Sequence, residues 1–363
     1  MSAEPKTQLI RLAKRDHMDP KKVWLIRIAA IVFALVLGGI PMALTGNSPI
    51  TAYGIIIQGS LSKPIYLKQT IKIAIPLLGV ALAIAPCFKM RFWNIGAEGQ
   101  ITMGAIAASY FALFWYDRIP HVPLLIIMFL AAALAGGIWA LIPAFFKAKW
   151  NTNETLFTLM MNYIAIGIVA WLQGGPWEGR KGSQIIPMFK QSARLPSVFG
   201  IHCGWIIVLI LVVVMYIYMN RTKQGYEIAV IGDSYNTARY AGMNVGRIMM
   251  RTMLVSGAIC GIVGFIVVSG ANYTLYKGVA NGVGFTSITV AWLSQLNAFA
   301  MIVISMILAI LTKGANTLQT RLQVPASIAD IVIGILLFCM LSCEFFINYK
   351  IILRHKAVQE VKA

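Results

Sequence analysis

Residues 124–146 read LLIIMFLAAALAGGIWALIPAFF, a long run without a charged side chain. A helix of about 20 apolar residues spans the ~30 Å hydrocarbon core of a bilayer. Comparable apolar runs recur along the chain from Leu25 to Asn348. This recurrence predicts an all-α fold, in which about ten transmembrane or re-entrant helices make a polytopic membrane protein.

The composition supports the same fold class. The chain has 363 residues, of which 59% are apolar and 12% charged, and its mean hydropathy is +0.76. Soluble domains carry about 25% charged residues. Ten crossings of ~20 residues leave loops and tails that are too short for an independent domain of typical size. We therefore expect one membrane domain and no soluble catalytic module.

The predicted membrane segments differ in length, and one is too short to cross. They are 25–45, 66–88, 96–115, 124–146, 154–173, 204–219, 248–272, 285–296, 297–312 and 326–347. Segment 285–296 is expected to be a half-helix or a re-entrant element. Such broken backbone persists at membrane depth only where protein or a water-filled cavity surrounds it.

The distribution of Lys and Arg predicts the orientation. Most basic clusters fall on one side, which is then cytoplasmic. The expected division is a cytoplasmic tail over 1–24, a transmembrane domain over 25–347 and a cytoplasmic tail over 348–363. Loop 220–247 lies inside and loop 174–203 outside, although the outer loop also carries Arg180 and Lys181. No small-residue cleavage site follows the first apolar run, so an uncleaved first span is expected.

The net charge of +19 does not indicate nucleic-acid binding, because the basic residues flank membrane segments and no basic face alternates with stacking aromatic residues. No phosphate-binding loop, zinc motif or nucleophile motif occurs. We therefore predict no catalytic residues, no metal site and no cofactor. The five cysteines are interpreted as small apolar side chains. Uphill transport would draw its energy from an ion gradient or from a partner ATPase.

The most informative motif is Asn94-Ile95-Gly96-Ala97-Glu98-Gly99-Gln100. Asn94 is a plausible helix N-cap, and Glu98 then lies in the first turn, where the helix dipole favours an anion. Asn94, Glu98 and Gln100 are candidates for the substrate pathway. Glu98 and Gln100 would face its cavity, because ionisable residues within a membrane usually mark pathways. The alternative is a polar helix start with a solvated Glu98. Glycine also interrupts 94–104 and 278–284, as in paired discontinuous helices that build a transport site.

These residues resemble the signature of membrane permeases of bacterial ABC importers, in the nucleoside branch that works with basic membrane lipoproteins. The wider family includes branched-chain amino acid and ribose permeases. Residues 153–165, which read NETLFTLMMNYIA, also match that branch. Thr158 and Asn162 share a helix face there. Asn162 is interpreted either as a contact between helices or as a substrate contact.

The inner loop resembles the family's coupling segment, a short helix that docks on the ATPase subunit. Small residues suit close docking, and charged residues suit the rim of the contact. The alternative is an ordinary solvated loop. The residues that the resemblance assigns to coupling are Tyr226, Glu227, Gly232, Asp233, Ala238, Arg239, Ala241 and Gly242.

Residues 282–293 resemble a further conserved run of the family. Phe285 and Trp292 are seven residues apart and share a helix face with Thr289 between them. This face is a candidate stacking platform for a nucleobase. Ordinary packing of aromatic residues is the alternative.

The resemblance implies a permease subunit of an ABC importer, with nucleosides as cargo. It also implies a cytoplasmic ATPase, a second permease chain and an extracytoplasmic substrate-binding protein, in a bacterial cell membrane. One alternative is a permease of the same family for branched-chain amino acids or simple sugars. Another is an ion-coupled secondary carrier, for which Glu98 and Asp330 are the candidate relay acids.

Overall fold

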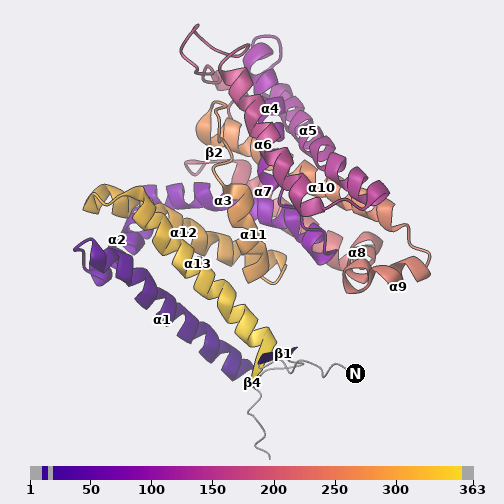
Figure 1. Ribbon diagram of the computed structural model, residues 1–363. Helices are drawn as coiled ribbons and strands as arrows, with labels where there is room; N and C mark the ends of the chain where they lie inside the picture. The colour runs from indigo at the N-terminus through magenta and orange to yellow at the C-terminus, as the bar shows by residue number, and fades with distance from the viewer. Residues whose placement is uncertain (1–9, 15–18, 354–363) are drawn as a thin grey trace, which may run out of the picture. The chain divides into compact units, whose positions relative to one another are not determined.

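The computed structural model describes residues 10–14 and 19–353, and these are predominantly helical (Figure 1). The helices are α1 (Pro20–Leu44), α2 (Pro49–Leu61), α3 (Pro64–Lys89), α4 (Ala97–Phe114), α5 (His121–Trp150), α6 (Glu154–Gln173), α7 (Gly204–Arg221), α8 (Lys223–Asp233), α9 (Tyr235–Tyr240), α10 (Val245–Ile266), α11 (Val283–Leu293), α12 (Ala298–Leu322) and α13 (Ala326–Asn348). Every predicted membrane segment contains a helix, so the all-α membrane fold is confirmed.

Ten crossings are not confirmed. Within the described residues, six helices are long and apolar enough to span a bilayer, namely α3, α5, α6, α7, α10 and α12. The bent pair α1 and α2 raises the number to seven if it counts as one span. Helix α11 is a shorter apolar helix, as predicted for 285–296. Helix α12 continues to Leu322 rather than ending at 312, because residues 313–322 are polar but contain good helix formers.

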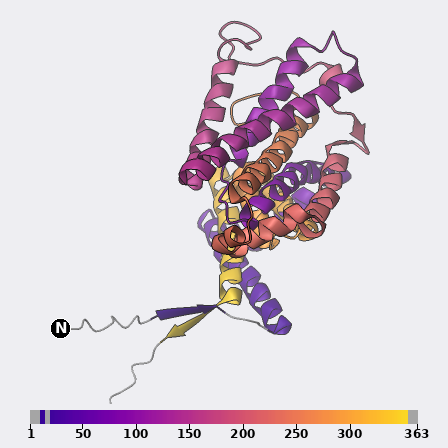
Figure 2. The ribbon, with the colours of Figure 1, turned by 90° about the vertical axis from the view of Figure 1, so that its right-hand side faces the viewer.

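The described residues group into two compact units, the first of which combines both ends of the chain, up to residue 55 and from residue 315. In this unit α1 packs against α13. Strand β1 (Ile10–Lys14) pairs antiparallel with β4 (Tyr349–Leu353), as Figure 2 shows. This two-stranded ribbon was not predicted, because its strands come from segments near opposite ends of the sequence. The Tyr53 hydroxyl donates to the Leu35 carbonyl at 2.7 Å.

The second unit, residues 56–314, contains the helices that carry the sequence motifs. The most buried candidate spans are α3 and α10 with its extension to Asn272, in which 72% and 83% of the residues in the most apolar stretch are buried. Helices α4, α5 and α10 pack side by side (Figure 1). Gly136 on α5 and Gly257 and Gly261 on α10 allow this close approach, because a Cβ on any of them would collide with backbone of the facing helix.

The loops between these spans are structured at both ends of the unit. The outer loop includes the 3₁₀ turn η1 (Gln191–Ala193) and the hairpin β2 (Ser197–Val198) with β3 (Ile201–His202). A π-helix, η2 (Val267–Asn272), extends α10. At the other end the expected inner loop 220–247 contains two short helices, α8 and α9. Local side chains cap this end: Thr222 accepts from Gly225 N, Ser234 from Thr237 N and Asn244 from Arg247 N.

Candidate functional site

The break between α3 and α4 is held by Asn94, which is fully buried. Its Oδ1 accepts from Gly96 N at 3.0 Å and from Gln100 Nε2 at 3.2 Å. Its Nδ2 donates to Ser256 Oγ on α10 at 3.4 Å. The predicted N-cap role is therefore wrong in detail: Gly96 is the N-cap of α4, and Asn94 fixes the turn that precedes it.

Helix α6 supports the same break from the other side. Thr158 Oγ1 accepts from Ile95 N at 3.2 Å. Asn162 Oδ1 accepts from Gly99 N at 2.8 Å, and its Nδ2 donates to Ile95 O at 2.9 Å. Both side chains share the predicted face, and the amide of Asn162 is occupied by backbone. Asn162 thus makes a contact between elements, and its role as a substrate contact stays a prediction.

Glu98 joins α4 to the start of α11. Its carboxylate oxygens accept from Gly282 N at 2.8 Å and from Gly284 N at 2.7 Å. Gly282 is the N-cap of α11 with φ +72°, and a Cβ on Gly284 would collide with Glu98. The anion lies where the dipole of α11 is positive. We call this arrangement the Glu98 clamp. Only 5% of Glu98 is exposed, so the alternative, a helix start with a solvated Glu98, is wrong.

The clamp brings together the two glycine-interrupted regions that were predicted to form a pair. Glu98 and Gln100 are both buried, with their polar atoms directed at protein groups. Their predicted role in lining a pathway stays a prediction.

Helix α11 has one buried face and one open face. On the buried face Ser287 Oγ donates to Leu77 O of α3 at 3.1 Å. On the opposite face Phe285 and Trp292 are exposed, and Thr289 between them is half-buried. The three residues therefore share an accessible face, as their spacing predicted.

Trp292 belongs to a cluster of three rings that extends beyond α11. Its ring stacks on Trp93 and on Phe88, and all three centroid separations are 5.7 Å. Trp93 is 46% exposed and Trp292 39%, whereas Phe88 is buried. We call these three rings the aromatic platform. The sequence interpretation missed Trp93 and Phe88, although Trp93 directly precedes the Asn94 motif.

The residues assigned to coupling divide into an inward and an outward set. Ala238 is fully buried in a cluster with Phe92 and Ile228, and Gly232 lies against the Lys89 carbonyl. Glu227 pairs with Arg251 of α10 at 2.7 Å. These three residues attach α8 and α9 to the rest of the unit. The exposed members are Tyr226, Asp233, Arg239, Ala241 and Gly242.

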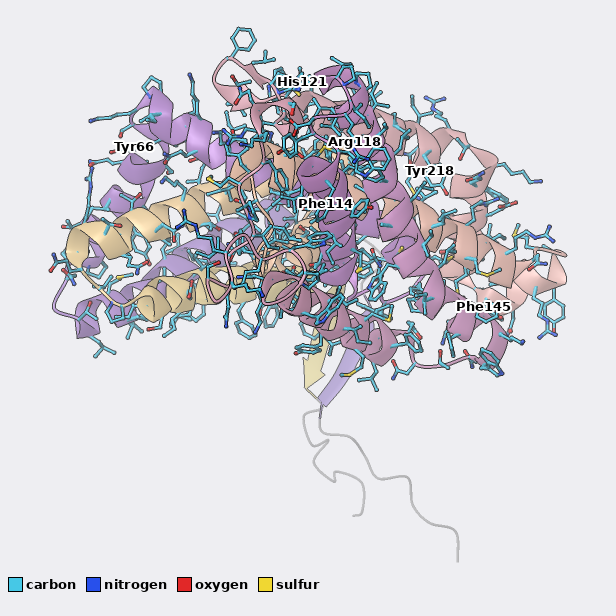
Figure 3. All side chains as sticks on the ribbon, turned by 90° about the horizontal axis from the view of Figure 1, so that it is seen from above. Tyr66, Phe114, Arg118, His121, Phe145 and Tyr218 are labelled. Carbon is cyan, nitrogen blue, oxygen red and sulfur yellow. The ribbon has the colours of Figure 1, made fainter. Side chains whose placement is uncertain are left out.

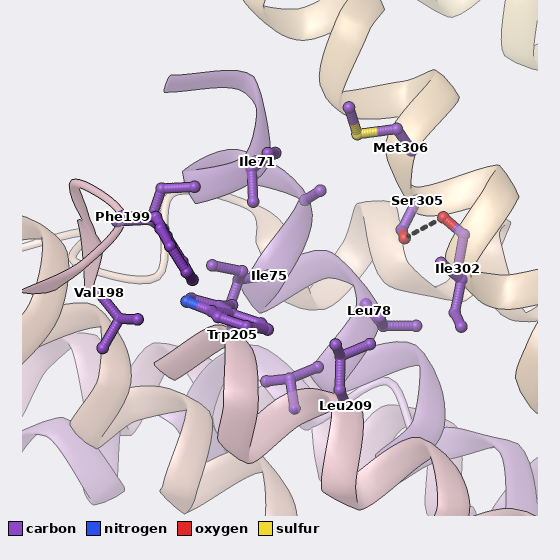
Figure 4. Close-up of a pocket in the computed structure, with 13 residues that line it drawn as sticks. Ile71, Ile75, Leu78, Val198, Phe199, Trp205, Leu209, Ile302, Ser305 and Met306 are labelled. Atoms are coloured by element: carbon purple, nitrogen blue, oxygen red, sulfur yellow. Dashed lines mark hydrogen bonds between the residues drawn. The ribbon is translucent and has the colours of Figure 1, made fainter. Parts of the chain in front are cut away.

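An apolar hollow of about 350 Å³ lies between α3, α7, α12 and the β2–β3 hairpin (Figure 4). Phe199 and Trp205 lie beside it, and Ser305 Oγ is bonded to the Ile302 carbonyl at 3.0 Å. Such a lining has almost no polar group to orient a hydrophilic cargo. Across residues 10–14 and 19–353, no three His, Cys, Asp or Glu side chains gather as they would around a metal ion.

The chain is similar to several known transport permeases. The chain is 30% identical to the glucose ABC transporter permease protein TsgB13 of Haloferax volcanii, over 92% of this chain and 93% of that one. It is 31% identical to the guanosine ABC transporter permease protein NupP of Bacillus subtilis, over 88% and 93%. It is 27% identical to the nucleoside ABC transporter permease protein NupB of Lactococcus lactis, over 89% and 92%.

The family described as the permease component of the branched-chain amino acid transport system matches residues 66–341, from α3 into α13. This match covers the Glu98 clamp, the aromatic platform, α8 and α9. The chain belongs to this family of transport permeases.

Proposed function

We propose that this permease imports nucleosides. The observation that carries the proposal is the aromatic platform, whose rings Trp93 and Trp292 are exposed beside the open face of α11. Aromatic rings bind nucleobases by stacking, at about 1–3 kcal/mol per base, without the need for charge. The relatives NupP and NupB, named for guanosine and nucleosides, support the same cargo. Glucose is the second candidate, because TsgB13 is named for it.

A cytoplasmic ATPase would supply the energy by docking on the exposed side of α8 and α9. We place these helices and both termini in the cytoplasm of a bacterial cell, following the distribution of Lys and Arg. A second permease chain and an extracytoplasmic binding protein would complete the importer.

The contacts suggest how movement of α8 reaches the site. Gly232 lies against the Lys89 carbonyl with no room for a Cβ, so α8 cannot shift without displacing the end of α3. Asn94 and Glu98 follow a few residues later in the chain. A displacement of the Lys89 region would therefore act on the Glu98 clamp and on Trp93, which stacks against α11.

The ion-coupled carrier is less well supported. A relay acid must exchange protons or ions with a pathway. Both carboxylate oxygens of Glu98 are instead engaged by backbone N–H groups. Asp330, the other candidate, is exposed on α13.

Substitution of the platform tests the cargo site. Trp93→Ala and Trp292→Ala should each lower nucleoside uptake by about fivefold to 150-fold, because a stacking contact of about 1–3 kcal/mol is lost. Trp171→Ala on α6, where the ring is 67% exposed, is the matched control and should leave uptake unchanged. If unlabelled glucose but not an unlabelled nucleoside competed for uptake, the cargo would be a sugar instead of a nucleoside. Unchanged uptake in both platform variants would refute the cargo site.

A further inference from the structure

The end of unit 56–314 that carries α8 also contains a basic pocket that includes no residue of the clamp or of the platform. This pocket is a hollow of about 730 Å³. Its walls come from the segment after α3, from the end of α5 with the loop that follows, from the start of α6, and from α8, α9 and α10. Among its lining residues are Arg91, Phe92, Lys147, Lys149, Trp150 and Tyr235.

The charge of the basic pocket is not balanced by its own acid. Lys147 pairs with Glu154 at 2.9 Å, which occupies the one carboxylate in the lining. Arg91 and Lys149 are exposed, and no carboxylate of the described residues pairs with either. The Lys149 ammonium instead lies 4.8 Å from the centre of the Trp150 ring. Two cations are thus available to an anion that enters from outside.

An apolar stripe on α5 leads to the pocket. Leu130, Leu134, Ile138 and Phe145 are exposed at helical spacing, and Lys149 and Trp150 follow at the end of the same helix. Phe145 lies near this end of α5, and His121 marks the opposite end (Figure 3). A soluble anion would use only the pocket, whereas an amphiphile would cover both the stripe and the pocket.

We propose that the basic pocket binds the headgroup of an anionic phospholipid, with the acyl chains along the exposed stripe of α5. Basic pockets between membrane helices on the cytoplasmic side suit such headgroups, and Trp residues favour the interface at which they lie. Ile231 of α8 also lines the pocket, so a bound headgroup would contact the helix that touches Lys89.

The test is native mass spectrometry of the full chain, purified in detergent with the subunits it retains and titrated with phosphatidylglycerol. The double variant Arg91→Asn with Lys149→Gln removes both available cations. Asn suits position 91 because Arg91 has φ +59°, a left-handed conformation that Asn tolerates. The matched control, Arg180→Gln with Lys181→Gln, removes two exposed basic residues from the outer loop.

Each basic residue near an anionic headgroup contributes about 1 kcal/mol, so phosphatidylglycerol binding should weaken about 30-fold in the double variant and about fivefold in Lys149→Gln alone. The single variant is the test if the double variant does not fold. The control and the binding of phosphatidylcholine should be unchanged. Equal phosphatidylglycerol binding by the wild type and both test variants would overturn the proposal. Displacement by millimolar inorganic phosphate would indicate a site for free anions. Loss of a co-purifying subunit with unchanged lipid binding would identify a protein-docking surface instead.

Discussion

Replacement of Glu98 by Gln should uncouple α11 from α4. The native carboxylate accepts two hydrogen bonds, at 2.8 and 2.7 Å, in a position only 5% exposed. Hydrogen bonds to charged groups contribute about 1.5–3 kcal/mol each. Glutamine keeps one acceptor oxygen but turns an amide NH₂ toward the second backbone N–H, which is then left unpaired. We expect a loss of about 2–3 kcal/mol, and roughly twice that for Glu98→Ala.

The assay is thermal unfolding of the detergent-solubilised protein. The fraction that stays folded after heating is measured by size-exclusion chromatography with fluorescence detection. For a domain of this size about 1 kcal/mol corresponds to roughly 2–4 °C, so Tm should fall by about 4–12 °C in Glu98→Gln. Glu178→Gln is the matched control, because Glu178 also accepts from a backbone N–H, that of Gln184, but in an exposed loop. Its Tm should change by no more than about 2 °C. Equal Tm values for the two variants would refute the structural role of the clamp.

Three further substitutions have defined outcomes. Gly232→Ala should reduce the stimulation of ATP hydrolysis by cargo, because the Cβ of the new alanine would collide with the Lys89 carbonyl. Membrane insertion should be retained, and normal stimulation would contradict the coupling role of Gly232. Asn162→Ala should lower the unfolding free energy by about 2–4 kcal/mol, since two buried hydrogen bonds are lost, and an unchanged Tm would argue against it. Burial, together with the charge of Lys72, lowers the pKa of His202 from 6.5 to about 4. Between pH 4 and pH 6.5 the folded chain therefore binds fewer protons than the unfolded chain. Stability should therefore be fully present above pH 6.5 and fall by at most about 3 kcal/mol toward pH 4, and His202→Phe should flatten the Tm profile measured over this range.

Much of the helical framework could be predicted because apolar length is a local property. The runs at 154–173 and 204–219 become α6 and α7 with nearly the predicted bounds. Glycine positions also indicated two breaks, which the structure places at 90–96 and 273–282 rather than over the whole of 94–104 and 278–284, because α4 is continuous from Ala97. Sequence spacing within one helix correctly placed Phe285, Thr289 and Trp292 on a common face.

Contacts between distant segments could not be predicted from local patterns. Glu98 accepts from two backbone N–H groups that lie nearly two hundred residues away in the sequence. Backbone N–H groups do not depend on the side chain, so the sequence does not mark them as partners. Trp93 can stack on Trp292 because α11 packs against both α3 and α4, the helices on either side of the segment that carries Trp93. The inward position of Ala238 is a further example, since small residues suit both docking on a partner and packing within the chain.

The most direct test of the central proposal is uptake of a labelled nucleoside by proteoliposomes that contain this chain, a second permease chain and the ATPase, with the extracytoplasmic binding protein supplied on the opposite side of the membrane from the ATPase. ATP on the side of the membrane that carries the ATPase should drive uptake. An excess of unlabelled nucleoside should compete with the labelled nucleoside, whereas a branched-chain amino acid should not. Uptake that follows an ion gradient in the absence of ATP would contradict the proposal and favour the secondary carrier.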